Sequence, residues 1–147
     1  MSADSMLNTG KKLRIFYITS IFSIAFAMLG FSYNAWRMEV TEDNSNIRTA
    51  AFEVLLQLSE LQQIIYSAHY DKNSDEGNPR KAWVKIGLIA DLSTLISPKV
   101  EADAVVLNTL WSENWQLVTD DEKFVQQLIS QIDKVRTDIN VVLKNLQ

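Results

Sequence analysis

The sequence contains no cysteine and only one histidine, His69. The absence of cysteine excludes a disulfide framework, thiolate metal sites and cysteine nucleophiles, although it does not identify the cellular compartment. A metal site needs several ligands in a fixed geometry, and no second histidine is available to join His69. The chain also lacks any strand pattern of useful length. These absences predict an all-α protein without a metal site.

Sequence motifs of catalysis are missing as well. There is no G-x-S-x-G motif, no phosphate-binding loop and no dinucleotide fingerprint, and no plausible nucleophile lies beside the histidine. The acidic residues are scattered over polar faces, whereas acid–base catalysis requires carboxyl groups in settings that shift the pKa. We therefore predict that the protein is not an enzyme and binds no cofactor.

Positive charge is scarce outside the first 14 residues. The chain has 14 Lys and Arg residues against 18 Asp and Glu residues, and three of the basic residues (Lys11, Lys12 and Arg14) precede an apolar block. The remainder of the chain is therefore more acidic than the whole. Such a surface would be repelled by nucleic-acid phosphates and by anionic lipid headgroups. We do not expect nucleic-acid binding.

Charge is absent altogether from residues 15–36 (IFYITSIFSIAFAMLGFSYNAW). About 22 helical residues rise ~33 Å, which is enough to cross a hydrocarbon core of ~30 Å. Basic residues precede this block and acidic residues follow it, so the positive-inside rule places residues 1–14 in the cytoplasm. Residues 37–147 would then form a periplasmic or extracellular domain anchored in a bacterial-type inner membrane. The sequence thus predicts a single-pass signal-anchor.

A cleaved signal peptide is the alternative interpretation of this block. Ala25-Phe26-Ala27 has the small-x-small pattern of a cleavage site, and cleavage would leave Met28 as the first residue of a secreted periplasmic protein. The apolar stretch continues past Ala27 through Leu29 and Phe31, which favours retention of the anchor.

Small residues lie on one face of the predicted membrane helix. The stripe consists of Thr19, Ser23, Ala27 and Gly30. Small side chains let a second helix approach closely, so this face is a candidate site for helix pairing in the membrane. Small residues are also common in membrane helices that do not pair.

After the anchor, hydrophobic residues recur at helical spacing. Steps of three and four residues form a first run consisting of Ile47, Ala51, Val54, Leu58, Leu61, Ile65 and Ala68. A second run consists of Val125, Leu128, Ile132, Val135, Ile139, Val142 and Leu146. A seven-residue repeat of this kind is typical of helices that pack along their length, as in coiled coils and bundles.

Two shorter helices are predicted between these runs, at residues 80–96 and 98–118. The polar segment 71–79 contains glycine and proline and indicates a loop. Four helices joined by short turns favour an antiparallel four-helix bundle. The first long helix can run directly out of the anchor. If the two are separated, residues 41–46 (TEDNSN) are the favoured place for a break, because their side chains compete for backbone hydrogen bonds.

Capping residues support these boundaries. Ser97 followed by Pro98 is typical of an N-cap with proline at the first helical position. Thr119 and Glu122 have the spacing of a capping box, with acidic residues against the positive end of the last helix dipole. Trp83 and Trp111 fall on apolar stripes, which predicts that both are buried in the core.

The predicted layout, a first membrane helix continuing into a helical bundle, is similar to the extracytoplasmic sensor bundles of bacterial chemoreceptors and sensor kinases. Those receptors return through a second membrane helix to a cytoplasmic signalling domain. This sequence instead ends, after one apolar block, in an amphipathic helix. The resemblance implies a ligand-sensing bundle that acts with a separate signalling partner.

Four residues are candidates for contact with a ligand or partner: Arg48, His69, Arg80 and Trp115. The two arginines could meet an anionic ligand between helices, and the tryptophan could anchor a partner. His69 sits at a helix end, where an ordinary structural role is favoured over pH sensing.

Asp71, Asn73 and Asp75 are spaced like the first three ligands of a calcium loop. Glutamate and alanine occupy the positions where that loop requires glycine and glutamate, so a solvated turn is favoured.

These observations predict an accessory or scaffold subunit of a membrane complex, which presents a helical bundle to a protein partner or to a second copy. A sensor-like bundle binding a small ligand is the first alternative, and a secreted periplasmic helical protein is the second.

Overall fold

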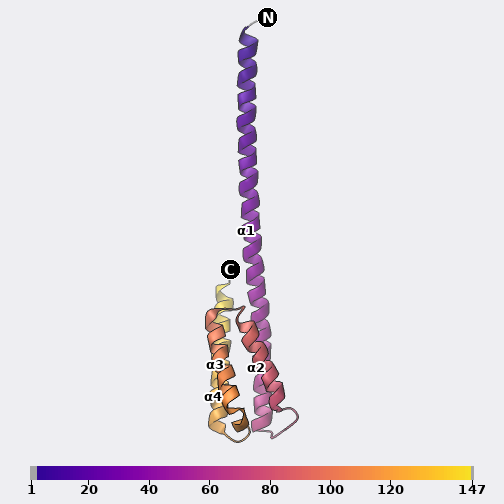
Figure 1. Cartoon of the computed structure of the whole chain (residues 1–147), viewed down its shortest axis with the longest axis vertical. Helices are drawn as coiled ribbons and strands as arrows, with labels where there is room; N and C mark the ends of the chain where they lie inside the picture. The colour runs from indigo at the N-terminus through magenta and orange to yellow at the C-terminus, as the bar shows by residue number, and fades with distance from the viewer. Residues whose placement is uncertain (1–2, 147) are drawn as a thin grey trace. The chain divides into compact units, whose positions relative to one another are not determined.

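A computed structural model describes residues 3–146, and these residues are helical throughout except for short connections (Figure 1). The elements are α1 (Ala3–His69), α2 (Pro79–Ser93), α3 (Pro98–Asn114), the 3₁₀ helix η1 (Trp115–Leu117) and α4 (Glu122–Asn145). No strand occurs among the described residues. The prediction of an all-α protein is therefore confirmed, and the four α-helices include one, α1, that also contains the predicted anchor.

The chain forms two compact units, Met1–Glu42 and Asp43–Gln147, and α1 contributes residues to both. Helix α1 is continuous through residues 41–46, so the alternative of a helix running directly on from the apolar segment holds and the break considered there does not occur. The Thr41 hydroxyl donates to the carbonyl of Arg37 at 2.8 Å, and the Thr49 hydroxyl donates to that of Ser45 at 2.9 Å. These hydroxyls bond to carbonyls of the preceding turn, a pattern that is compatible with the helix.

In the first unit, the side chains of residues 15–36 are exposed, apart from a partly covered Ser20. Large apolar residues project in every direction from this part of the helix, from Ile15 to Trp36. Among the described residues, α1 is the one helix long and apolar enough to cross a membrane. A signal sequence near the N-terminus would meet the same criteria of length and composition.

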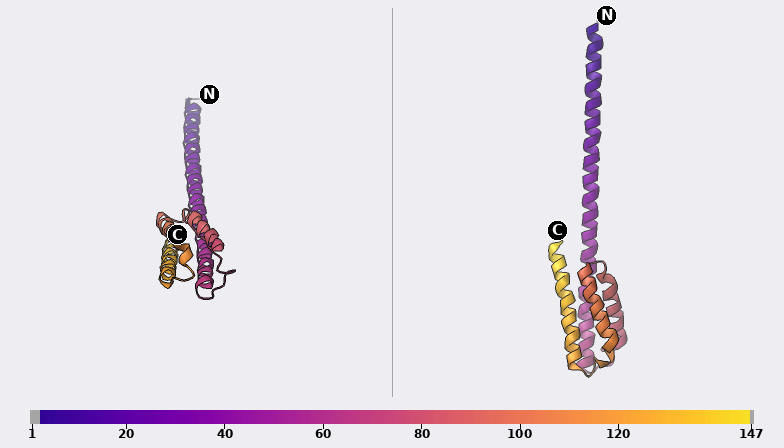
Figure 2. Two further views of the ribbon diagram at one scale, coloured as in Figure 1. Left: turned by 60° about the horizontal axis from the view of Figure 1, so that its bottom comes forward. Right: turned by 60° about the vertical axis from the view of Figure 1, so that its left-hand side comes forward.

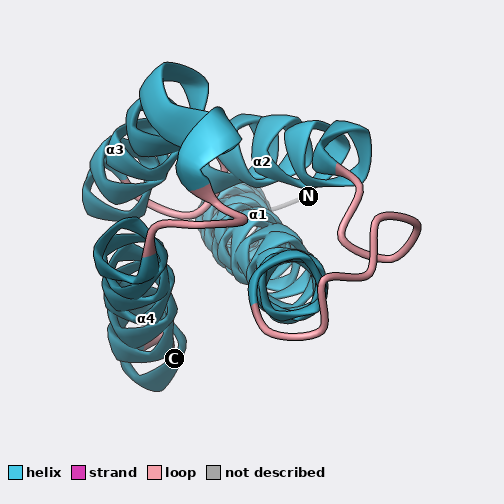
Figure 3. Cartoon of the chain, turned by 90° about the horizontal axis from the view of Figure 1, so that it is seen from below, coloured by secondary structure: helices cyan, strands magenta, loops and turns pink. Residues whose placement is uncertain are grey.

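In the second unit, α2, α3, α4 and the last part of α1 lie side by side around one apolar core (Figures 2 and 3). The core includes six of the seven residues of the first predicted run, with Ile47 partly exposed at its edge. It also includes the first five residues of the second run. The predicted spacing therefore identified the buried faces of α1 and α4.

Contacts between residues distant in sequence give the order of the helices. The most extensive backbone contacts between helices join α3 to α4 and α3 to α2. Lys85 of α2 forms an ion pair with Glu60 of α1. The start of α4 lies at the end of α1, where Glu122 contacts His69, and its C-terminal end lies near Arg48. Each helix therefore contributes to a shared core and also to contacts at its rim.

Helix caps set the boundaries of the second unit. The side chain of Ser97 accepts a hydrogen bond from the Val100 amide at 3.3 Å, as predicted. The capping box predicted from Thr119 is wrong, because α4 begins at Glu122 and its N-cap is Asp121. The Asp121 carboxylate accepts from the Phe124 amide at 3.0 Å. The turn before α4 is therefore two residues longer than the capping-box pattern implied.

The two central tryptophans differ in burial. Trp111 is 1% exposed, as predicted, whereas Trp83 is 40% exposed, so the prediction of its burial is wrong. Helix α2 turns Ala82, Ile86 and Ile89 toward the core, and Trp83, one residue after Ala82, lies at the edge of that face. The two indoles still meet edge to face, with ring centroids 6.3 Å apart.

Candidate functional site

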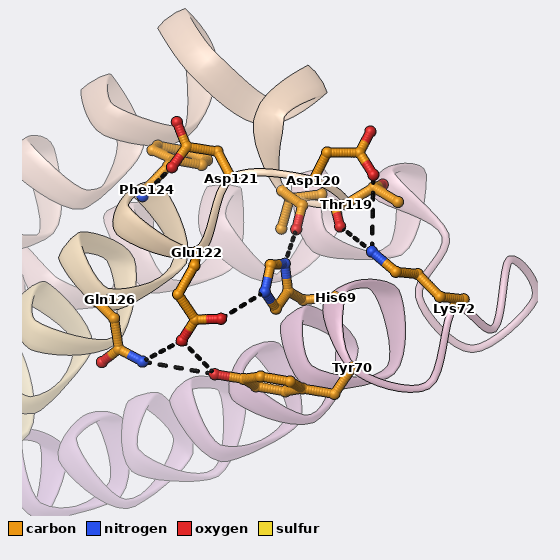
Figure 4. A network of polar contacts seen from close by, with 10 residues as sticks. His69, Tyr70, Lys72, Thr119, Asp120, Asp121, Glu122, Phe124 and Gln126 are labelled. Atoms are coloured by element: carbon orange, nitrogen blue, oxygen red, sulfur yellow. Dashed lines mark hydrogen bonds and ion pairs between the residues drawn. The ribbon is translucent and has the colours of Figure 1, made fainter.

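The only histidine lies in a polar cluster where the end of α1 meets the start of α4 (Figure 4). His69 is 8% exposed. Its Nδ1 is 2.9 Å from the carbonyl oxygen of Val118, and its Nε2 is 2.9 Å from Oε2 of Glu122. Both ring nitrogens are therefore occupied by groups of the same chain.

The chemistry of these contacts indicates which groups donate hydrogen bonds. A backbone carbonyl only accepts hydrogen bonds, so Nδ1 of His69 must donate to Val118. Hydrogen bonds to Glu122, first from His69 and then from Gln126 and Tyr70, hold the pKa of its carboxyl below the usual range. The contact between Nε2 and Oε2 joins the histidine ring to this carboxylate.

Neighbouring side chains extend this cluster. The Tyr70 hydroxyl and the Gln126 amide each donate to Oε1 of Glu122, at 3.1 Å in both cases. Partial burial, followed by the hydrogen bond with Glu122, raises the pKa of Tyr70. Lys72 donates to the carbonyl of Thr119, and its ammonium is 3.6 Å from the Asp120 carboxylate. The cluster thus joins the end of α1 to the turn before α4.

This arrangement assigns the histidine a structural role. A catalytic base needs a ring nitrogen within reach of a substrate, and a metal ligand needs an unprotonated nitrogen facing the ion. In His69 both nitrogens face partners from the turn and from α4. Among the described residues, no group of three or more His, Asp or Glu side chains is arranged to hold a metal ion.

The other three candidate residues lie apart from the histidine. Arg48 is about six helical turns from His69 along α1, or ~31 Å, and its guanidinium lies 3.4 Å from the Leu146 carbonyl. Arg80 is exposed in the first turn of α2. Trp115 is partly buried against the core. The structure therefore does not gather the four candidates around one cavity.

The acidic segment after α1 folds as a turn in which Asn73 has a structural role. The Asn73 side-chain oxygen accepts hydrogen bonds from the amides of Asp75 and Glu76, at 3.0 and 3.1 Å. Its carbonyl accepts from the Gly77 amide at 2.8 Å. This pattern matches the turn favoured by the sequence, with Asn73 oxygens engaged by the backbone.

The small-residue stripe of the first unit is exposed in the single chain. The Thr19 hydroxyl donates to the carbonyl of Ile15 at 2.8 Å, and the Ser23 hydroxyl donates to that of Thr19 at 2.9 Å. Gly30 has no neighbour within 4 Å of the position that a Cβ would occupy. Helix pairing through Thr19, Ser23, Ala27 and Gly30 stays a prediction.

A surface groove between α1 and α2 was not anticipated from the sequence. It consists of two separate hollows, one near each end of α2, which together are called the α1–α2 groove below. The first hollow, of about 600 Å³, is lined by Glu60, Gln63, Ile64, Ser67, Glu76, Lys81, Val84 and Lys85. The second, of about 670 Å³, is lined by Asp43, Asn46, Ile47, Thr49, Ala50, Glu53, Leu92 and Leu95.

One sequence signal could have indicated this groove. Val84 and Leu88 lie off the apolar stripe of α2 that continues through Ile86 and Ile89, so one buried face does not account for them. Leu95, in the turn after α2, is also exposed. The position of the acidic groups opposite them depends on how α1 packs beside α2, which the stripe alone does not specify. The Glu122–His69 contact likewise depends on tertiary packing.

Comparison with known proteins gave no relatives: the sequence matches no family model, no curated protein and no solved structure.

Proposed function

We propose that this protein is a single-pass membrane tether that holds an antiparallel four-helix bundle at the outer face of a bacterial-type inner membrane, where the bundle binds a protein partner. The observation that carries the proposal is the exposure of large apolar side chains on every side of residues 15–36. A helix that is apolar all round requires an apolar environment. Lipid supplies that environment, and a helix satisfies its own backbone groups there.

The distribution of charge supports the proposed orientation. Lys11, Lys12 and Arg14 precede the apolar segment, and acidic residues follow it. Basic residues are retained on the cytoplasmic side of a membrane. The hydroxyls of Thr19, Ser20 and Ser23 bond to carbonyls of their own helix, which reduces the cost of placing them in lipid.

The interaction role is supported by the groove and by the structural use of the histidine. The single histidine is engaged by its own chain, whereas the α1–α2 groove leaves apolar residues of α2 exposed. Contiguous exposed apolar surface in a folded domain is typical of an interaction site. The groove therefore favours recognition by the second unit over catalysis.

Single-cysteine labelling tests the tether and its orientation, because the natural chain has no cysteine. Lys11→Cys and Ser130→Cys would be produced separately in cells and treated with a membrane-impermeant maleimide. We expect the protein in the membrane fraction, with labelling of intact cells at position 130 only. Labelling at position 11 in intact cells would contradict the orientation, and recovery of a shortened chain beginning at Met28 would favour the secreted alternative.

A ligand-sensing bundle with a separate signalling partner is the second candidate. The first hollow favours it, because Lys81 and Lys85 lie with Glu60 and Glu76 around a partly apolar wall. Such a site would suit a small zwitterion. A thermal-shift screen with amino acids on the full chain tests it, and stabilisation that Lys81→Ala abolishes would support sensing over protein binding.

A further inference from the structure

The α1–α2 groove has apolar walls that the chain leaves uncovered. In the first hollow, Val84 is 68% exposed beside the nearly buried Ile64. In the second, Leu95 is 58% exposed beside Ile47 and Leu92. Leu88 of α2, which lies between Val84 and Leu95 in the sequence, is also exposed. A line of apolar side chains between two helices is the kind of surface into which an amphipathic helix docks.

The spacing of the hollows indicates the length of the occupant. Ala50 lines the second hollow and Ile64 lines the first, and both belong to α1. They are about four helical turns apart, or ~21 Å. A helix that filled both hollows would need roughly 15 residues or more, with apolar side chains recurring every three or four positions.

The charge of the groove indicates the composition of the occupant. Its lining contains four carboxylates (Asp43, Glu53, Glu60 and Glu76) and two ammonium groups (Lys81 and Lys85), a net charge of −2. Lys85 is already paired with Glu60. The charged groups that line the second hollow are both carboxylates, from Asp43 and Glu53. Complementary charge at this end of the groove requires lysine or arginine on the occupant.

A second copy of this chain is a poor occupant on the same grounds. The longest apolar stripes of the second unit, on α1 and α4, are directed into its own core and cannot fill the groove of another copy. The chain as a whole is acidic, with a formal net charge of −4. Two acidic surfaces repel each other at close range, whereas a basic helix is attracted.

We propose that the α1–α2 groove binds a basic amphipathic helix from a different membrane-associated protein. This inference rests on the proposed function, because it identifies the chemistry of the partner that the bundle recognises. The apolar face of that helix fills the two hollows, and its lysine or arginine residues meet Asp43 and Glu53. The carboxylates make the site selective for charge, and the hollows make it selective for helical spacing.

Site-specific photo-crosslinking in cells tests the proposal on the full, membrane-bound chain. A photoreactive phenylalanine analogue would replace Val84 or Leu95 in the groove. It would replace Val105 on α3 or Val141 on α4 as matched controls, because these are also exposed apolar positions. Crosslinked peptides would then be sequenced by mass spectrometry. Each variant would also be tested for membrane retention, which reports on the tether separately.

We expect both groove positions to crosslink to one segment of a different protein, with helical apolar spacing and an excess of lysine and arginine. Crosslinking at the control positions should be at least tenfold weaker. The double variant Asp43→Lys, Glu53→Lys should reduce the groove adducts at least tenfold, whereas Glu113→Lys on α3 should leave them unchanged. The proposal would be overturned by crosslinks to a second copy of this chain or by groove crosslinks that persist in the double variant Asp43→Lys, Glu53→Lys. It would also be overturned by crosslinks of equal yield at the control positions. If no groove adduct forms while the chain stays in the membrane, this inference fails and the tether stands.

Discussion

At the residue scale, Gly77 shows how closely the loop after α1 packs against that helix. A Cβ added at this position would lie 2.4 Å from the backbone nitrogen of Ala68 and 2.5 Å from its Cα. Backbone atoms of a packed helix cannot move aside as a flexible side chain can. Glycine is therefore required here by a close approach.

We expect Gly77→Ala to lower the free energy of unfolding by about 1–3 kcal/mol, because the loop must move away from α1. Gly87→Ala is the matched control, since Gly87 lies in α2 with no neighbour within 4 Å of its Cβ position. That change should stabilise the protein by about 0.5–1 kcal/mol. Thermal unfolding followed by circular dichroism would measure both, and equal effects of the two variants would contradict the close approach.

The Glu122 carboxylate should make stability depend on pH in the acid range. Its pKa in the folded protein lies below the ordinary value of about 4.5, chiefly because His69 donates to it. A group with a depressed pKa contributes stability above its unfolded pKa, and that contribution is lost as the pH falls through the folded value. Protonation of Glu122 at low pH would therefore loosen the junction of α1 and α4.

We expect the melting temperature of the natural protein to fall more steeply below about pH 4.5 than that of Glu122→Gln. Both proteins keep the contribution of Asp103, whose pKa is lowered by its hydrogen bond with Asp138 and by Lys134, so the difference between them isolates Glu122. Glu113→Gln, at an exposed position of α3, should retain the natural profile. Parallel profiles for all three proteins would show that the Glu122 contact does not stabilise the fold.

At the scale of single elements, α4 depends on the residue that caps it. Asp121 has extended backbone angles, and its carboxylate accepts from the Phe124 amide, so it satisfies one of the free amides of the first turn. Thr119 instead lies in the preceding turn, where its carbonyl accepts from Lys72. The two residues therefore make different contributions to the start of the helix.

We expect Asp121→Ala to destabilise the protein by about 1 kcal/mol through the loss of the N-cap. Thr119→Ala keeps the backbone carbonyl that Lys72 contacts, so its effect should stay within about 0.5 kcal/mol. Chemical denaturation of the two variants side by side would measure the difference. A larger loss of stability for Thr119→Ala than for Asp121→Ala would support the capping box suggested by the sequence.

At the scale of the whole molecule, the protein consists of two units with different solvent requirements. The unit Met1–Glu42 exposes apolar side chains along residues 15–36, whereas Asp43–Gln147 buries its apolar residues in one core. The core residues of the second unit all come from residues 50–139. The second unit therefore contains the groups needed for its own stability.

We expect a fragment of residues 43–147 to fold without the apolar segment and to remain soluble without detergent. It should be highly helical and should unfold in one cooperative transition, because a single core joins its helices. Size-exclusion chromatography and thermal circular dichroism would test this expectation. Aggregation or a non-cooperative transition would mean that the first unit contributes to folding of the second.

The sequence by itself determined the helical class, the apolar block at residues 15–36 and the buried faces of α1 and α4. These features follow from local rules, because helical periodicity repeats every few residues and the order of apolar residues marks the face that must be buried. The Ser97 cap was predictable for the same reason, since the residue and the amide it caps are three positions apart.

Tertiary structure alone decided the features that join distant segments. Four such features depend on where one helix lies against another. They are the start of α4 at Glu122, the exposure of Trp83, the contacts of His69 with Val118 and Glu122, and the α1–α2 groove. A periodic pattern specifies which face of a helix is buried, but it does not specify the rotation and spacing of its neighbours. For that reason the position of His69 at a helix end followed from the sequence, and its partners followed only from packing.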